Sequence, residues 1–163
     1  MSNIQVVDNY LPKDYFEGLQ KMFFDLPWMF KNFSVTKGDG YPQFVHHFYE
    51  DHIPLSDYWK YVVPLVEQIN PNALIRMKAN ATPREDLIKE KMLHVDQLKE
   101  NSNLDYRVMI LYINSNDGYT FFENGDRIES VANRAIFFPN DIEHAGTNCT
   151  NQPIRWVLNV NYL

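Results

Sequence analysis

Two histidines and one acidic residue in the second half of the chain could together bind a metal ion. His94 and Asp96 are two positions apart, and His144 and Arg155 follow later. Two imidazoles and one carboxylate leave three positions of an octahedral Fe(II) ion free, as oxygen-activating non-haem iron sites require. Arg155 could bind the far carboxylate of a keto-acid co-substrate through two parallel hydrogen bonds. The set therefore predicts oxidative chemistry at a single iron ion.

Strand alternation indicates that these residues can face one cavity. In an extended segment over 92–96, His94 and Asp96 point the same way and Val95 points the opposite way. The last predicted strand, 154–162, has a polar face and an apolar face. The polar face carries Arg155, Val157, Asn159 and Asn161, and the apolar face carries Trp156, Leu158 and Val160.

The polar face of this last strand also predicts what fills the cavity. Buried amides need hydrogen-bond partners, so Asn159 and Asn161 favour a pocket filled by water or by a cofactor. Pairing with backbone at a sheet edge is the alternative for both. Tyr112 shares one face of the predicted strand 106–114 with Val108 and Ile110. Its hydroxyl is useful there if it reaches a carboxylate, and plain core packing is the alternative.

The predicted elements change in kind near residue 73. Before that point we expect a helix after Pro12, a strand over 43–49, and a second helix from Ser56 to about Ile69. The buried side of the second helix is expected to carry Trp59, Val62, Val63 and Val66, and Pro64 lies inside it. After that point short strands are expected over 73–79, 92–96, 106–114, 119–123, 127–131, 135–138, 143–147 and 154–162, with Asn124-Gly125-Asp126 as a tight hairpin turn.

Helices followed by about eight closely spaced strands predict a mainly β, α+β fold. The expected architecture is a double-stranded β-helix, or jelly-roll barrel, with the N-terminal helices packed on one sheet. We expect residues 1–163 to form a single domain, with 1–72 as a helical support region and 73–163 as the jelly-roll core.

Composition limits the class of protein. With 163 residues and 45% hydrophobic content, the chain can bury one core and is short for two ordinary domains. A net charge of −6 argues against binding nucleic acid by bulk electrostatics. A single cysteine, Cys149, excludes an internal disulfide and fits a reducing compartment. Without a signal-like start or an 18-residue apolar run, the expected location is the cytoplasm and no membrane partner is expected. The oligomeric state stays open.

These residues, in this order, resemble the Fe(II)/2-oxoglutarate-dependent dioxygenases of the prolyl 4-hydroxylase-like branch. Within this branch, the sequence especially resembles the small stand-alone members found in bacteriophage genomes. The resemblance covers residues 73–163. It is carried by His94-Val95-Asp96, Leu111-Tyr112-Ile113-Asn114, Asp117-Gly118-Tyr119-Thr120-Phe121-Phe122, Phe137-Phe138-Pro139, His144-Ala145-Gly146 and Arg155-Trp156.

The resemblance implies a role for each matched residue. His94, Asp96 and His144 would ligate Fe(II), and Arg155 with Tyr112 would bind the distal carboxylate of 2-oxoglutarate. Asn159 and Asn161 would line the same cofactor pocket. The implied co-substrates are 2-oxoglutarate and O2, and the default substrate is a prolyl side chain of a peptide or protein. A phage-encoded member would act in the host cytoplasm.

The sequence departs from the family pattern at two places, both in the part of the site where a substrate would bind. The family hairpin often carries a second glycine where this chain has Tyr119, and the segment 83–91 before His94 matches no family residue. Two other functions therefore stay open: a non-catalytic jelly-roll binding or virion-associated module, and a metal-dependent isomerase or hydrolase of the cupin type. Metal content and consumption of 2-oxoglutarate distinguish these alternatives.

Overall fold

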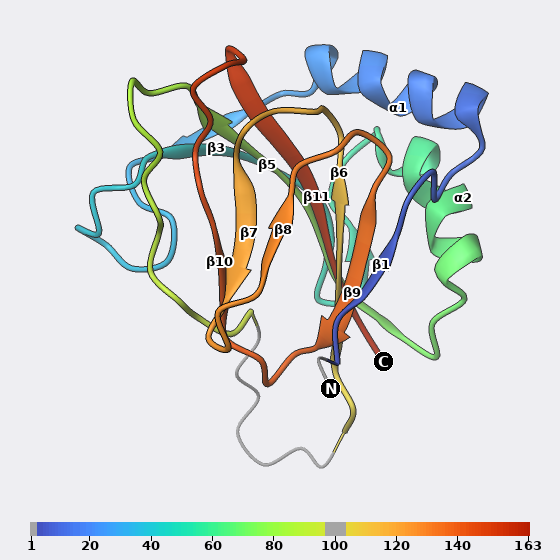
Figure 1. Ribbon diagram of the computed structural model, residues 1–163. Helices are drawn as coiled ribbons and strands as arrows, with labels where there is room; N and C mark the ends of the chain where they lie inside the picture. Colours follow the sequence, from blue (N-terminus) through green and yellow to red (C-terminus); the bar gives the residue numbers. More distant parts are fainter. Residues whose placement is uncertain (1–2, 97–103) are drawn as a thin grey trace.

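The computed structural model describes residues 3–96 and 104–163, which form two facing sheets with two helices on one outer side (Figure 1). The elements in chain order are β1 (Gln5–Val7), α1 (Lys13–Asp25), β2 (Met29–Lys31), β3 (Gln43–Glu50), β4 (Ile53–Pro54), α2 (Trp59–Ile69), β5 (Leu74–Pro83), β6 (Arg107–Tyr112), β7 (Tyr119–Phe122), β8 (Arg127–Glu129), β9 (Ala135–Pro139), β10 (His144–Gly146) and β11 (Ile154–Tyr162).

The larger sheet has eight strands in the order β1-β9-β6-β11-β5-β3-β2, with β4 paired to β3 outside this path. The smaller sheet has the order β10-β7-β8. Neighbouring strands are antiparallel in both sheets. The jelly-roll prediction, with helices on one sheet, is confirmed. Among the described residues, neither helix is long and apolar enough to cross a lipid bilayer.

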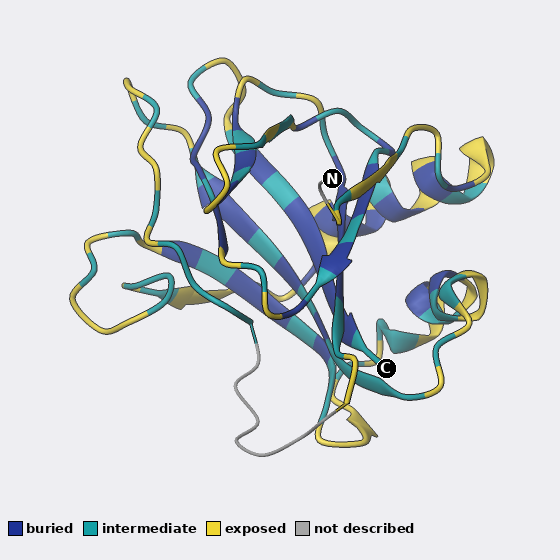
Figure 2. Ribbon diagram, turned by 60° about the horizontal axis from the view of Figure 1, so that its bottom comes forward, coloured by how far each residue is buried: buried dark blue, intermediate teal, exposed yellow. Residues whose placement is uncertain are grey.

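The larger sheet separates two apolar layers. Its outer face packs against α1 and α2, where Phe23 and Leu65 are fully buried together with Leu158 from β11. Its inner face packs toward the smaller sheet through Val108, Tyr112 and Val157, among others, and Phe122 of β7 meets them from the smaller sheet. Figure 2 shows the resulting alternation of buried and partly buried residues along the strands. Full burial of a Leu or Phe side chain contributes roughly 1.5–3 kcal/mol, so the outer layer holds the helices firmly on the sheet.

Most predicted strands are present, with three differences. Residues 92–96 are not a strand, because His94 alone makes a backbone bridge, to His144. β5 is longer than expected and runs to Pro83. Residues 1–72 supply β1 to β4 of the larger sheet as well as the two helices, whereas only one strand, over 43–49, was expected there. The division at residue 72 stays a prediction.

The second helix begins later than predicted and turns a slightly different side to the core. It starts at Trp59, and its fully buried residues are Val62 and Leu65, while Val63 is only partly buried. The spacing of Val62, Leu65, Val66 and Ile69 follows the 3.6-residue period better than the predicted set did.

Asn133 connects the N-terminal segment to the turn that precedes β9. Its side-chain amide donates to the Leu11 carbonyl oxygen at 2.9 Å and its side-chain oxygen accepts from the Leu11 amide at 2.9 Å. The Tyr10 amide donates to the Asn133 carbonyl oxygen. With φ at 62°, Asn133 has a left-handed backbone that asparagine tolerates well. These contacts fix where the chain enters α1.

We predict that Asn133→Ala lowers the free energy of unfolding by about 1–3 kcal/mol, because it leaves buried groups of Leu11 without partners. Urea unfolding measures the change. The control is Asn72→Ala, at an exposed position, which should stay within about 0.5 kcal/mol of the parent protein. Equal stability of the two variants would contradict the role given to Asn133.

Candidate active site

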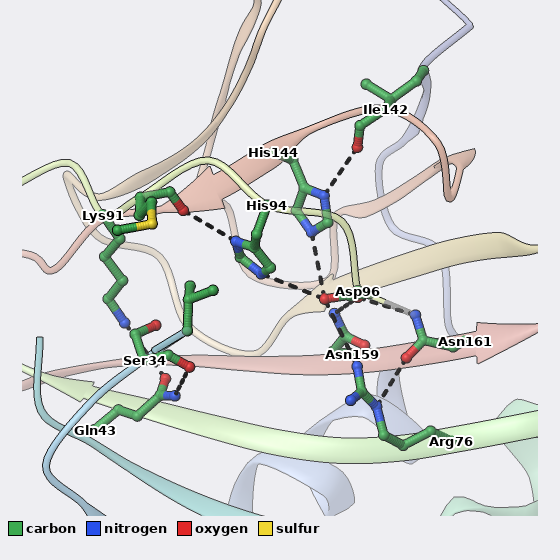
Figure 3. Close-up of polar contacts among 12 residues, drawn as sticks. Ser34, Gln43, Arg76, Lys91, His94, Asp96, Ile142, His144, Asn159 and Asn161 are labelled. Atoms are coloured by element: carbon green, nitrogen blue, oxygen red, sulfur yellow. Dashed lines mark hydrogen bonds and ion pairs between the residues drawn. The ribbon is translucent and has the colours of Figure 1, made fainter. Parts of the chain in front are cut away.

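Three side chains that the sequence predicted as metal ligands converge at one point. The nearest ligand atoms of His94, Asp96 and His144 all lie within 4.8 Å of one another. Asp96 Oδ1 is 3.5 Å from His94 Nε2 and 3.8 Å from His144 Nε2 (Figure 3). In the described part of the chain, no other group of three His, Cys, Asp or Glu side chains has this geometry.

The two histidines are paired by backbone as well as by side chain. The His94 amide donates to the His144 carbonyl oxygen at 3.1 Å, and the His144 amide donates back to His94 at 3.0 Å. His144 begins β10, and the ring of Phe138 packs edge-on against its imidazole. These reciprocal hydrogen bonds hold the 92–96 segment beside β10. They position His94 and Asp96 in place of the full strand that was expected.

Both imidazoles are held in the tautomer that a metal ligand needs. His94 Nδ1 lies 3.1 Å from the Met92 carbonyl oxygen, and His144 Nδ1 lies 3.3 Å from the Ile142 carbonyl oxygen. A ring nitrogen that faces a carbonyl oxygen carries the proton, so Nε2 of each ring keeps its lone pair and points toward Asp96.

Asp96 is a buried carboxylate with a side chain only 4% exposed. Its Oδ2 accepts hydrogen bonds from Asn159 Nδ2 at 2.7 Å and from Asn161 Nδ2 at 3.0 Å. Arg76 Nη2 lies 3.7 Å from Oδ1, and Arg76 Nε donates to Asn161 Oδ1 at 3.0 Å. The amides therefore fix one oxygen and leave the other directed at the two imidazoles.

The surroundings set the charge of these groups. Burial raises the pKa of Asp96, but the neighbouring side chains of His94, His144, Lys78 and Arg76 lower it by more, so the pKa lies well below its usual value. Burial lowers the pKa of His144, against the opposing effect of Asp96. An ionised carboxylate and a neutral imidazole are the forms that bind a metal ion.

The structure gives Asn159 and Asn161 a specific place. Both were predicted to bind the cofactor, and both amides contact Asp96, while Asn159 also lines the cavity beside the metal ligands. Their contact with a co-substrate stays a prediction. Arg76 was not predicted as a site residue. No local pattern points to it, because its pairing with Asn161 depends on the register between the distant strands β5 and β11.

Arg155 lies at the other end of the same cavity, where it is 4% exposed. Its Nε donates to Ser130 Oγ at 2.8 Å and its Nη2 donates to Thr120 Oγ1 at 3.2 Å. Within residues 3–96 and 104–163, the structure gives this guanidinium no carboxylate partner. A buried cation without an opposite charge is costly, so the site favours an anionic ligand.

Tyr112 lies behind Arg155. Its hydroxyl donates to Thr120 Oγ1 at 2.8 Å, and its ring centre is 5.6 Å from the Arg155 guanidinium carbon. The predicted contact between this hydroxyl and 2-oxoglutarate stays a prediction. Thr120 Oγ1 accepts from both Tyr112 and Arg155, so its own proton is free for a ligand in the cavity. Sequence reasoning missed Thr120 and Ser130, although alternation along 119–122 turns Thr120 inward.

Gly118 is required by the close approach of Arg155. A Cβ atom at this position would lie 2.4 Å from the Asn148 carbonyl oxygen and 2.7 Å from Arg155 Cδ. The next residue, Tyr119, replaces the second glycine of the family hairpin. Its hydroxyl donates to Glu90 Oε1 at 2.8 Å, and Arg127 lies over its ring. Tyr119 therefore connects the 83–91 segment to the start of β7, the central strand of the smaller sheet.

Comparison with known proteins gives matches by structure only. No protein-family model matches the sequence, and no curated protein matches it. Among solved structures, a prolyl-4-hydroxylase from Pseudomonas putida is similar with a TM-score of 0.69 at 12% identity, over 99% of this chain and 92% of that one. A prolyl hydroxylase from Trichoplax adhaerens, in complex with a peptide fragment of hypoxia inducible factor, has a TM-score of 0.69 at 14% identity over 100% and 84% of the two chains.

A third similar structure comes from a virus. The 2-oxoglutarate complex of a collagen prolyl hydroxylase from Paramecium Bursaria Chlorella virus-1 has a TM-score of 0.62 at 10% identity, covering 99% of this chain and 97% of that one. At these identities the likeness establishes the fold. The chain has the jelly-roll fold of the 2-oxoglutarate and Fe(II) oxygenases that include prolyl hydroxylases, as the sequence resemblance predicted.

We predict that Asn161→Ala weakens metal binding about 10- to 100-fold, because Asp96 loses a partner that orients it. Anaerobic titration with Co(II), followed by its visible spectrum, measures the affinity. The control is Asn80→Ala, which removes another amide of the same cavity; its side-chain oxygen has no hydrogen-bond partner in the part of the chain that the structure describes. If both variants bind Co(II) like the parent protein, Asn161 does not position the ligand.

Proposed function

We propose that the protein is an Fe(II)- and 2-oxoglutarate-dependent oxygenase that hydroxylates a side chain of a peptide or protein, with proline as the default residue. The observation that carries the proposal is one cavity with a His-Asp-His group at one end and, at the other, the buried Arg155, which has no carboxylate partner among the described residues. A keto acid with a second carboxylate matches both ends.

The donor set fits ferrous iron. Two neutral imidazoles and one ionised carboxylate are the facial ligands of non-haem Fe(II) oxygenases, and both histidines already expose Nε2. Bound Fe(II), together with 2-oxoglutarate and O2, would supply the oxidative decarboxylation that places one oxygen atom on a substrate C–H bond. The protein holds the ligand geometry through Asn159, Asn161 and the two backbone carbonyls that fix the imidazole tautomers.

The rest of the cavity suits 2-oxoglutarate. Arg155 and Thr120 offer donors to its distal carboxylate, and the side chains of Ile110 and Val157 line the cavity as apolar walls for its methylene groups. Gly146 leaves room beside the guanidinium, since a Cβ atom there would lie 3.0 Å from Arg155 Nη1. The arrangement binds a dicarboxylate in one orientation, with its keto end toward His94, Asp96 and His144.

The substrate class is supported by likeness. Three similar structures are prolyl hydroxylases, and one of them holds a peptide. On this basis we extend the proposal to a peptide or protein substrate. We also propose that the protein acts in the reducing cytoplasm, where ferrous iron and the single thiol of Cys149 stay reduced.

We predict that the Fe(II)-loaded protein converts 2-oxoglutarate to succinate in air, slowly without substrate and faster with prolyl peptides that gain the mass of one oxygen. Asp96→Ala should abolish succinate formation, because the metal loses its carboxylate ligand. The control is Asp57→Ala on the surface before α2, which should keep the parent rate. Succinate is quantified by chromatography and the peptides by mass spectrometry.

Full turnover in Asp96→Ala would remove the ligand assignment. Tight metal binding without any succinate, with or without peptides, would favour the non-catalytic binding module instead.

A further inference from the structure

We propose that the substrate carries an anionic group, a carboxylate or a phosphate, which binds Lys78 and Lys91 beside the candidate iron site. This inference rests on the proposed function and names the substrate class of the same cavity. It is carried by the charges that line the cavity and by the fact that, among the described residues, no carboxylate forms an ion pair with either lysine.

The cavity has more positive charge than its proposed ligands neutralise. Its charged lining residues are the cations Lys78, Lys91 and Arg155 and the single carboxylate Asp96, apart from the histidines. Fe(II) brings two positive charges and 2-oxoglutarate brings two negative charges, so together they leave this balance unchanged. A surplus of positive charge therefore remains for a third ligand.

Lys78 lies on β5 at the metal end of the cavity. In the register it is opposite Asn159 of β11 on one side and His47 of β3 on the other. Across the described ranges, the structure gives its ammonium group no hydrogen bond and no ion pair. The Lys78 ammonium group is therefore available to a ligand that brings a hydrogen-bond acceptor or a negative charge into the cavity.

Lys91 lies on the segment before His94, whose sequence matched no family residue. Its backbone amide donates to the Gly146 carbonyl oxygen at 3.3 Å. Its Nζ lies 3.2 Å from Thr82 Oγ1 and 3.5 Å from Gln43 Oε1, which are uncharged acceptors. Figure 3 shows Lys91 reaching toward Gln43 and Ser34.

The nearby acid that could neutralise Lys91 is already engaged. The carboxylate of Asp39 accepts hydrogen bonds from the backbone amides of Ser34, Val35, Thr36 and Tyr41. Glu50, at the end of β3, pairs with His47 at 3.2 Å. These contacts leave both lysines without a carboxylate of their own in the described chain.

The pKa directions agree with this geometry. Burial and the charge of Arg155 lower the pKa of Lys91 to about 7, and burial and the charge of Arg76 lower the pKa of Lys78 to about 8. Burying two such amines near other cations opposes folding, and strongly shifted groups gather at functional sites. An anion bound between them would offset the unfavourable charge.

The proposed co-substrate leaves these lysines available. Its distal carboxylate is assigned to Arg155 and Thr120, and its keto end to the metal ligands. Lys78 and Lys91 extend from β5 and from the 83–91 segment, which form other walls of the cavity. They therefore fit a charge on the substrate, next to the atom that is oxidised.

The test uses protein loaded with Zn(II), which cannot turn over, and saturated with 2-oxoglutarate. Three probes are titrated by calorimetry: the N-acetyl dipeptide amides aspartyl-proline, phosphoseryl-proline and lysyl-proline. We expect at least one acidic probe to bind about tenfold or more tightly than the lysyl probe, a difference of about 1.4 kcal/mol. Comparison of the two acidic probes tells carboxylate from phosphate.

The variants assign the effect to the two lysines. The double variant Lys78→Met with Lys91→Met should lose the acidic preference, and Lys78→Arg should keep it. Methionine has a similar length and removes an unpaired buried charge, so the fold should persist, and thermal unfolding checks this. The control is Lys13→Met, whose side chain is 85% exposed on α1.

The inference is overturned if the acidic and lysyl probes bind equally, if the lysyl probe binds more tightly, or if neither acidic probe binds. In each case, binding of 2-oxoglutarate in the same sample would leave the proposed function intact. A loss of 2-oxoglutarate affinity in the double variant as large as that in Arg155→Ala would assign the lysines to the co-substrate and also overturn it. Failure of the parent protein to bind 2-oxoglutarate would instead contradict the proposed function.

Discussion

The buried carboxylate of Asp96 is the group on which the candidate site depends. A charge this deeply buried is tolerated only when it is paired and hydrogen-bonded. Here Asn159 and Asn161 donate to Oδ2, and Arg76 lies 3.7 Å from Oδ1. The two imidazoles also face Oδ1. The same contacts that make the ionised carboxylate tolerable thus direct Oδ1 toward the place where a metal ion would bind.

Strand β11 connects this constraint to the rest of the fold. One face of the strand holds Arg155 beside Ser130 and Thr120, and it holds Asn159 and Asn161 beside Asp96. The other face packs Trp156, Leu158 and Val160 against the helices. The spacing of the two ends is therefore set by the backbone rise of one strand, and the helices stabilise it from behind. A rigid strand is better suited than a loop to hold two ligand sites at a fixed separation.

Much of this could be predicted from the sequence because strand alternation is a strong local rule. It placed His94, Asp96 and Arg155 correctly around one cavity, and it separated the two faces of β11. It could not find β2 and β4, which are three and two residues long and form through pairing with the distant β3 rather than through a local pattern. The strand expected over 92–96 is absent for a related reason. This segment makes only one pair of backbone hydrogen bonds, with His144, and that pair depends on a residue far away in the chain.

Side-chain partners were the least predictable part of the site. Tyr112 was correctly placed on the inner face, yet its hydroxyl contacts Thr120, and Thr120 rather than Tyr112 lines the cavity. Arg76 and Ser130 enter the site from β5 and from the turn after β8, and no spacing in the sequence links them to Asp96 or Arg155. Such contacts depend on the register of strands far apart in the chain, which becomes known only when the sheet is assembled.

We propose that one cavity binds ferrous iron at His94, Asp96 and His144 and 2-oxoglutarate at Arg155. The most direct test is an anaerobic optical titration of the Fe(II)-loaded protein with 2-oxoglutarate. We expect a weak visible charge-transfer band in the parent protein. The band should be lost in His94→Ala and should require a much higher 2-oxoglutarate concentration in Arg155→Ala. A parent protein that retains no iron, or that binds iron without developing the band, would contradict it.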